Sequence, residues 1–248
     1  MTIDLTPRGT ADGSAVITHG LTEVMVDVFG PKEAKLRGQT SHDRALVTVE
    51  VGIMPFSTGE RRKRNRGDKR ILELAATIKQ TFEPVIQTAL YPRSEISIFV
   101  HILQQDGGLL PASINATTLA LITAGIPLTD YVTAITCGVY STNPLLDLNT
   151  IEENDIPHLT VASLPRTGKV TLVAMETRLH VERTAVLGIY VRRLIRAAAD
   201  PTDVTIQEDA LTDVIKHRLN IASLLFLWTV ATATGDFDNP DVSVRKGP

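Results

Sequence analysis

The sequence predicts an α/β protein, built as an α+β two-layer sandwich of helices and strands. Segments in which apolar and polar residues alternate dominate the chain before residue 180, and two segments with helical periodicity interrupt them. Their order, β-β-β-α-β-α-β-β-β-α, lacks the strict βαβ alternation of a doubly wound sheet. The composition agrees, since 43% hydrophobic and 21% charged residues are typical of a soluble globular domain.

The first half of the chain begins with a predicted hairpin. Residues 14–18 and 23–29 are expected to be strands, with His19-Gly20 as the turn between them. We expect Gly30-Pro31 to end the second strand. Residues 45–51 predict a third strand, because their apolar side chains alternate with threonine and glutamate.

Two helices follow in the pattern. Apolar residues recur at three- and four-residue spacing over residues 69–85, which predicts an amphipathic helix that ends near Pro84. A strand over 95–103 is broken by Asp106-Gly107-Gly108, and a second helix rich in small residues follows over 112–124. The remaining predicted elements are strands over 132–140, 159–164 and 170–176 and a helix over 180–199.

Asp200-Pro201-Thr202 is typical of a domain boundary. We therefore expect one domain over residues 1–199 and a C-terminal extension over 200–248, partly helical with a loose tail. The longest uncharged stretch, 219–235, contains Asn, Ser and Thr, so it is too short and too polar to predict a membrane span. We expect no secretory signal, because the N-terminal residues contain no apolar stretch.

Positive charge is concentrated in one segment. The formal net charge is only −3, yet residues 61–70 read RRKRNRGDKR, and the remainder of the chain is acidic. This basic segment (61–70) predicts contact with the sugar-phosphate chain of RNA or DNA, and the alternatives are a solvated loop or a nuclear-import signal. The basic segment contains no aromatic residue, so binding is expected to be independent of base sequence, sensitive to salt and without base stacking there.

Most familiar catalytic patterns are absent from the sequence, including the P-loop, GxGxxG, HExxH and GxSxG. The six histidines are dispersed, and His101, His180 and His217 are expected to have structural or surface roles. The single cysteine, Cys137, excludes a disulfide framework and a multi-cysteine zinc site, and we expect it to be buried.

Two further features leave alternatives open. The acidic cluster (Asp147, Glu152, Glu153 and Asp155) has the oxygen ligands that suit magnesium, but a solvated loop between strands is the favoured interpretation. The Gly107-Gly108 pair would allow a backbone to approach a phosphate at a helix start, but a plain strand-to-helix turn is favoured.

A series of motifs over roughly residues 8–199 resembles the RNase PH superfamily, and within it the exosome ring subunits of the type that is catalytic in archaea. Their order and spacing are more specific than any one of them. The motifs are Ala11-Asp12-Gly13-Ser14, Val28-Phe29-Gly30-Pro31-Lys32-Glu33, Met54-Pro55-Phe56-Ser57-Thr58, Tyr91-Pro92-Arg93-Ser94, Leu103-Gln104-Gln105-Asp106-Gly107-Gly108, Leu119-Ala120-Leu121-Ile122 before Ala124-Gly125-Ile126, and Leu146-Asp147-Leu148-Asn149. The resemblance implies an RNase PH-like fold of the ribosomal protein S5 domain 2-like type.

The chain departs from the family where the family's chemistry resides. Active members follow Asp-Gly-Gly with a Ser or Thr and then an Arg, which hold the attacking phosphate, and this chain has Leu109 and Leu110. The two aspartates that serve metal and acid roles align with Asn154 and His158, and a shift of one or two residues would instead bring Glu153 or Asp155 to the first position. The resemblance thus implies no catalysis, no metal and no cofactor.

The retained basic residues lead to an expected function. The resemblance implies a non-catalytic, RNA-binding structural subunit of the eukaryotic RNA exosome, which guides RNA 3′ ends through a central channel for processing of rRNA and decay of mRNA. The expected RNA-binding residues are Arg61, Arg62, Lys63, Arg64, Arg66, Lys69, Arg70 and Arg93, the last with an equally weighted structural role.

The resemblance also implies partners and a location. The expected partners are RNA, paralogous RNase PH-like subunits in a hexameric ring, S1/KH cap proteins and a hydrolytic nuclease, in the nucleus, nucleolus and cytoplasm, with no membrane association. Two alternatives remain, an active phosphate-dependent 3′→5′ exoribonuclease and a stand-alone nucleic-acid-binding module. Leu109 and Leu110 argue against the first alternative.

Overall fold

The computed structural model describes residues 2–33, 41–61, 67–140 and 143–175. Its larger sheet has five strands in the order β1-β2-β3-β5-β4. β4 runs parallel to β5, and the other neighbouring pairs are antiparallel. The bounds are β1 (Thr2–Leu5), β2 (Gly13–His19), β3 (Thr22–Glu33), β4 (Leu46–Ile53) and β5 (Ser94–Gln104).

A second sheet contains four antiparallel strands in the order β7-β6-β8-β9. The bounds are β6 (Thr133–Tyr140), β7 (Asn143–Leu146), β8 (His158–Leu164) and β9 (Lys169–Met175). Cys137 lies in the apolar cluster of this sheet with Val139, Leu159 and Val161, and it is fully buried as expected. Burial raises the pKa of the Cys137 thiol to about 12.

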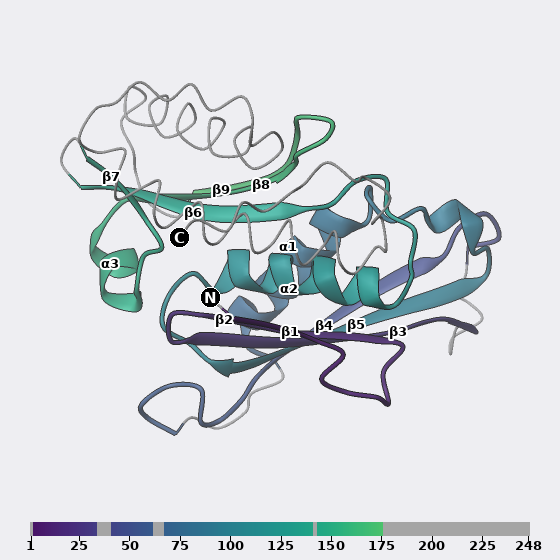
Figure 1. Ribbon diagram of the computed structural model, residues 1–248, viewed down its shortest axis with the longest axis horizontal. Coiled ribbons are helices and arrows are strands. Elements are labelled where there is room, and N and C mark those ends of the chain that lie inside the picture. The colour runs from purple at the N-terminus through teal and green to yellow at the C-terminus, as the bar shows by residue number, and fades with distance from the viewer. Residues whose placement is uncertain (1, 34–40, 62–66, 141–142, 176–248) are drawn as a thin grey trace, which may run out of the picture. The chain divides into compact units, whose positions relative to one another are not determined.

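The helix α2 lies between the two sheets, and α3 lies beside them (Figure 1). The helical elements are α1 (Lys69–Phe82), the short 3₁₀ helix η2 (Thr88–Leu90), α2 (Leu109–Thr123) and α3 (Thr150–Asp155). α2 packs against β2 and β3 on one side and against β6 and β8 on the other. Nine of its residues are therefore buried. The three polar ones among them, Ser113, Thr117 and Thr118, each donate a hydrogen bond to a backbone carbonyl oxygen one turn earlier.

Alternating side chains of the larger sheet form the core beneath α2. Val24, Val26 and Val28 of β3 are fully buried, and so are Ile98 and Val100 of β5. Successive side chains of a strand point to opposite faces, so the intervening residues lie on the outer face of this sheet. The amphipathic helix α1 contributes two fully buried residues of its predicted stripe, Ile78 and Phe82.

Several sequence-based expectations need correction. Gly30-Pro31 does not end the second strand, because β3 resumes its pairing with β5 at Lys32 after an irregularity. α2 begins at Leu109, earlier than expected, since Pro111 lies in the first helical turn, where an N–H has no partner to lose. The short elements β1, β7 and α3 were not predicted. The hairpin around His19-Gly20 is confirmed, as is the general course of α1.

Three expectations lie outside the described residues: the helix over 180–199, the domain boundary at 200 and the C-terminal extension over 200–248. His180 and His217 lie there too. Within the described residues, no helix has the length and apolar character needed to cross a membrane.

Candidate functional site

Three connections meet at one end of the five-stranded sheet. β4 and β5 run parallel, and α1 lies in the connection between them. The C-terminal ends of β4 and β5 therefore lie at the same end of the sheet, together with the loop after β4, the start of α1 and the start of α2. The Met54 N–H donates to the Ile102 carbonyl oxygen at 3.0 Å, and the Gln105 N–H donates to the Ser57 carbonyl oxygen at 3.0 Å. These bonds attach the loop 54–61 to the residues that lead into α2.

Two glycines shape the turn into α2. Gly107 has φ +81° and Gly108, the N-cap residue, has φ +59°, both in the left-handed region. A Cβ on Gly107 would collide with the backbone of Leu148 and Asn149, so a glycine is needed for this close approach. The Thr22 hydroxyl holds the turn by donating to the Gly107 carbonyl oxygen at 2.6 Å.

A carboxylate occupies the N-terminus of α2. Gly108 has no capping side chain, and its N–H donates to Oε1 of Glu153 at 2.8 Å. A capping box begins α3 and orients Glu153: Asn149 Oδ1 accepts the Glu152 N–H at 2.9 Å, and Glu152 Oε2 accepts the Asn149 N–H at 3.0 Å. Helix N-termini attract anions, and here the anion belongs to the chain itself.

The residues at the start of α2 add no group that binds phosphate. Leu109 and Leu110 are its first two residues, are half-buried and carry no hydroxyl or guanidinium. Pro111 removes one of the free N–H donors of the first turn. A phosphate that approached within about 4 Å of the Glu153 carboxylate would meet a repulsion of about 4 kcal/mol per pair of unit charges at an effective dielectric constant of about 20.

The two positions aligned with the family's aspartates do not form a metal site. Asn154 is exposed, and its side-chain amide donates to the Thr150 carbonyl oxygen at 2.7 Å within its own helix. His158 is buried at the start of β8, with Nδ1 3.2 Å from the Ile156 carbonyl oxygen. Glu153 is bound to Gly108. The donor set therefore does not fit magnesium, which prefers several convergent oxygen ligands.

The acidic cluster lies in a partly exposed connection between strands, as the favoured interpretation expected, but the connection is not a plain loop, because a capping box starts α3 there. Its members contact different groups: Oδ1 of Asp147 lies 3.0 Å from Nε2 of His19 in the β2–β3 hairpin, and Asp155 is exposed. In the described part of the chain, no three His, Cys, Asp or Glu side chains are grouped to hold a metal ion. The cluster connects the β7–α3 region to the larger sheet.

The described part of the basic segment consists of Arg61 and residues 67–70, and Arg61, Lys69 and Arg70 are all exposed. Arg62, Lys63, Arg64 and Arg66 lie outside the described residues. α1 starts with Lys69 and Arg70 and has no acidic residue in its first turn. Cations at a helix N-terminus oppose the helix dipole, so these two side chains do not serve the stability of α1. The Asp68 carboxylate offsets part of this cost by accepting the Arg70 N–H at 3.1 Å.

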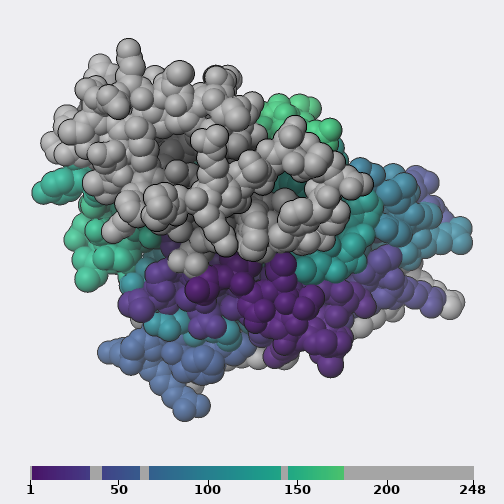
Figure 2. Space-filling view, in the orientation of Figure 1, coloured from purple at the N-terminus to yellow at the C-terminus, as the bar shows by residue number. Residues whose placement is uncertain are grey.

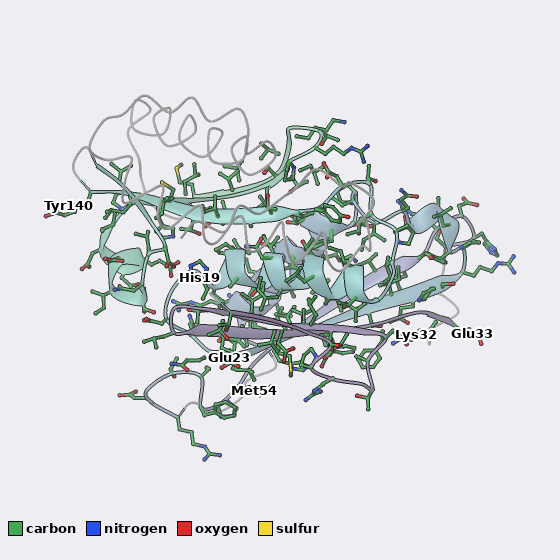
Figure 3. The ribbon with its side chains drawn as sticks, in the orientation of Figure 1. His19, Glu23, Lys32, Glu33, Met54 and Tyr140 are labelled. Carbon is green, nitrogen blue, oxygen red and sulfur yellow. The ribbon has the colours of Figure 1, made fainter. Side chains whose placement is uncertain are left out.

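Arg93 lies apart from Arg61, Lys69 and Arg70, the other predicted RNA-binding residues that the structure describes. It precedes β5, whereas the site follows β5, and the 11 residues of this strand span roughly 35 Å. Figure 3 shows Lys32 and Glu33, whose strand pairs with the start of β5, at the opposite end of the sheet from Met54. Arg93 is exposed with φ +60°, and its Nε donates to Nδ1 of His42 at 3.1 Å. This contact suits the structural role; its RNA-binding role stays a prediction.

Comparison with known proteins identifies the family. The sequence profile of the RNase PH 3′ exoribonuclease family, domain 1, matches residues 1–127. The exosome complex component RRP41 of Homo sapiens is 40% identical over 218 residues, which cover 87% of this chain and 85% of that protein. The chain belongs to the RNase PH family.

Other similarities agree with this RNase PH membership. The exosome complex component ski6 of Schizosaccharomyces pombe is 45% identical over 171 residues, covering 69% of this chain and 71% of that protein. The crystal structure of rice (Oryza sativa) Rrp46 aligns with a TM-score of 0.68 and 26% identity, covering 80% of this chain and 91% of that one. The predicted α/β class and RNase PH-like fold are therefore confirmed.

Sequence reasoning on the RNase PH motifs singled out Leu109 and Leu110 just before the second predicted helix, and the structure makes them the first two residues of α2. It missed two other features of the site. It did not predict that Glu153 contacts Gly108, although Asn149 and Glu152 carry the sequence signal of a capping box. It also named Phe56 only as part of a family motif and gave it no binding role, although Phe56 precedes the basic segment and is exposed.

Proposed function

We propose that this chain is a non-catalytic, RNA-binding ring subunit of the RNA exosome. Its similarity to proteins named as exosome complex components supports membership of that complex. By analogy with the family, it pairs with paralogous RNase PH-like subunits in a hexameric ring beneath S1/KH cap proteins, and RNA passes to a separate hydrolytic nuclease. It acts in the nucleus, nucleolus and cytoplasm, which imaging of the tagged chain would test.

One observation supports the proposed lack of catalysis: the Gly108 N–H donates a hydrogen bond to the Glu153 carboxylate, next to Leu109 and Leu110. Phosphorolysis requires an inorganic phosphate to approach an anionic RNA phosphodiester, so the enzyme must supply positive charge at that point. Here the helix N-terminus already binds a carboxylate, and the next two side chains are aliphatic. Loss of a single electrostatic donor of this kind costs about 3–4 kcal/mol of transition-state stabilisation.

RNA binding is supported by the charge that remains. Arg61, Lys69 and Arg70 are exposed at the same end of the sheet as the start of α2. Exposed Arg and Lys side chains bind the phosphates of a polynucleotide without reading its sequence, and such binding weakens as salt rises. The chain therefore holds RNA without cleaving it.

Titration of the full-length chain with inorganic phosphate tests the blocked site. The wild type should show no saturable binding and no shift of the Gly108 amide resonance. The double variant Leu110→Arg with Glu153→Ala should bind phosphate, because it removes the competing anion and adds a cation. Asp155→Ala is the matched control, since it removes an exposed carboxylate from the same helix. Saturable phosphate binding by the wild type at Gly108 would contradict the proposal.

A further inference from the structure

The loop between β4 and the basic segment presents an exposed aromatic ring. Phe56 is 67% exposed. Of the described aromatic side chains, only Tyr140, at 66%, is comparably exposed, and it lies in β6 of the other sheet. A single exposed apolar residue is ordinary on a protein surface, so the surroundings of Phe56 decide whether its exposure has meaning.

The backbone around Phe56 is held firmly. The Ser57 N–H donates to the Met54 carbonyl oxygen at 3.0 Å, which closes a turn with Pro55 at its second position. Ser57 is only 3% exposed, and its carbonyl oxygen accepts the Gln105 N–H. The turn is thus attached to the sheet on both sides, and it presents the ring to solvent. Figure 2 shows the blue segment after β4 projecting from the described surface.

The charges near this turn favour a polyanionic partner. By sequence, residues 56–70 contain seven Lys or Arg and two acidic residues, Glu60 and Asp68. Of the described cations, Arg61 follows Phe56 by five positions and is exposed, and Lys69 and Arg70 begin α1 at the same end of the sheet. Proteins that bind single-stranded nucleic acid combine such cations, which contact the phosphates, with aromatic rings on which bases stack.

A protein partner would instead be expected to meet a wider apolar surface. Among the described residues between Phe56 and Ile71, the exposed ones are Gly59, Glu60, Arg61 and residues 67–70, none of which has an apolar side chain. The next exposed apolar side chain along the described chain is Leu72 of α1.

We propose that Phe56 stacks on a base of single-stranded RNA whose phosphates are held by Arg61, Lys69 and Arg70. The inference rests on the proposed function and adds to it a contact with an RNA base, beside the contacts with the phosphates. Base stacking on an aromatic ring tolerates all four bases, so the contact increases affinity without sequence preference. This revises the expectation, drawn from the basic segment alone, that stacking is absent from the region.

The proposal is tested by comparing the binding of two fluorescent oligomers of equal length, oligoadenylate and an abasic oligomer. Both are measured on the chain alone and on the complex that copurifies with it. Phe56→Ala should weaken oligoadenylate binding about tenfold and leave abasic binding unchanged. Phe56→Trp should restore affinity and Phe56→Leu should not, because leucine is apolar but has no aromatic face. Tyr140→Ala is the matched control and should have no effect.

Other results would overturn the inference. If Phe56→Ala weakens binding of both oligomers equally, its effect is a general structural one. If RNA affinity is unchanged but the variant loses copurified subunits, Phe56 belongs to a protein interface. The slope of affinity against salt separates this inference from the proposed function. Charge reversal at Arg61, Lys69 and Arg70 should reduce that slope, whereas Phe56→Ala should leave it unchanged. If charge reversal changes nothing, the proposed RNA-binding function fails independently of Phe56.

Discussion

Reversing the charges at the start of α1 should stabilise the protein and weaken RNA binding. Lys69 and Arg70 occupy the first turn, which has no acidic residue, and both are exposed. An acidic side chain in a first turn interacts with the helix dipole more favourably than a basic one by about 0.3–1 kcal/mol. The double variant Lys69→Glu with Arg70→Glu should therefore gain about 1 kcal/mol, which raises Tm by about 2–4 °C in a domain of this size.

The same variant should lose RNA affinity, because two phosphate contacts are removed. For single-stranded RNA, the slope of log K against log salt should become shallower by about 1.4, at about 0.7 for each lost contact. The measurements are thermal denaturation and fluorescence anisotropy across a salt series, on the full-length chain.

Lys79, in the last turn of the same helix, provides the matched control. A cation is favourable there, so Lys79→Glu should lower the free energy of unfolding by about 0.3–1 kcal/mol and leave RNA binding unchanged. The reasoning is refuted if reversal at Lys69 and Arg70 destabilises the fold as Lys79→Glu does, or if RNA affinity and its salt slope stay at wild-type values.

Three further predictions concern the site and the core. Gly107→Ala should lower the free energy of unfolding by about 3 kcal/mol, measured by chemical denaturation, because the new Cβ would collide with the Leu148 carbonyl oxygen. Gly125 also has a positive φ, +67°, but has open space around it, so Gly125→Ala should cost only about 1 kcal/mol. Equal losses in the two variants would argue against close packing at Gly107. Asn149→Ala should cost about 1 kcal/mol and shift the Gly108 amide resonance, since it removes the cap that orients Glu153; an unmoved resonance would uncouple the two contacts. Burial raises the pKa of the Cys137 thiol from 9.0 to about 12, so the thiol of the folded protein should resist Ellman's reagent at pH 8. The free energy of unfolding should also fall as pH rises from about 9 to about 12, because over this range the thiol ionises in the unfolded chain but not in the folded one. Rapid labelling of the folded protein would contradict this prediction.

Strong periodicity made the long elements of the fold predictable. The apolar spacing from Ile71 to Phe82 identified α1, and the alternation of residues 95–103 identified β5. Short elements carry little periodicity, which is why β7 and α3 were missed: α3 has six residues, and its capping box rather than its apolar pattern defines it. The division of the strands between two sheets depends on long-range pairing, which no local pattern records.

The candidate site was predictable where it depends on the chain order. Leu109 and Leu110 follow a Gly-Gly turn, so the sequence placed them between β5 and the next helix, although it began that helix at 112 and the structure begins it at Leu109. The contact between Gly108 and Glu153 joins residues 45 positions apart, and it required the structure. The same holds for Phe56, whose exposure follows from a turn closed between Met54 and Ser57 and not from its apolar character.

The central claim is that the chain binds RNA without cleaving it. Its most direct test is to incubate end-labelled single-stranded RNA with the complex that copurifies with this chain, after the separate hydrolytic nuclease has been inactivated. Magnesium and inorganic phosphate are supplied together, and the products are separated by thin-layer chromatography. We expect the RNA to stay bound and intact, with no nucleoside diphosphate released. Phosphate-dependent release of nucleoside diphosphates that is abolished by substitution of Glu153 would contradict the account.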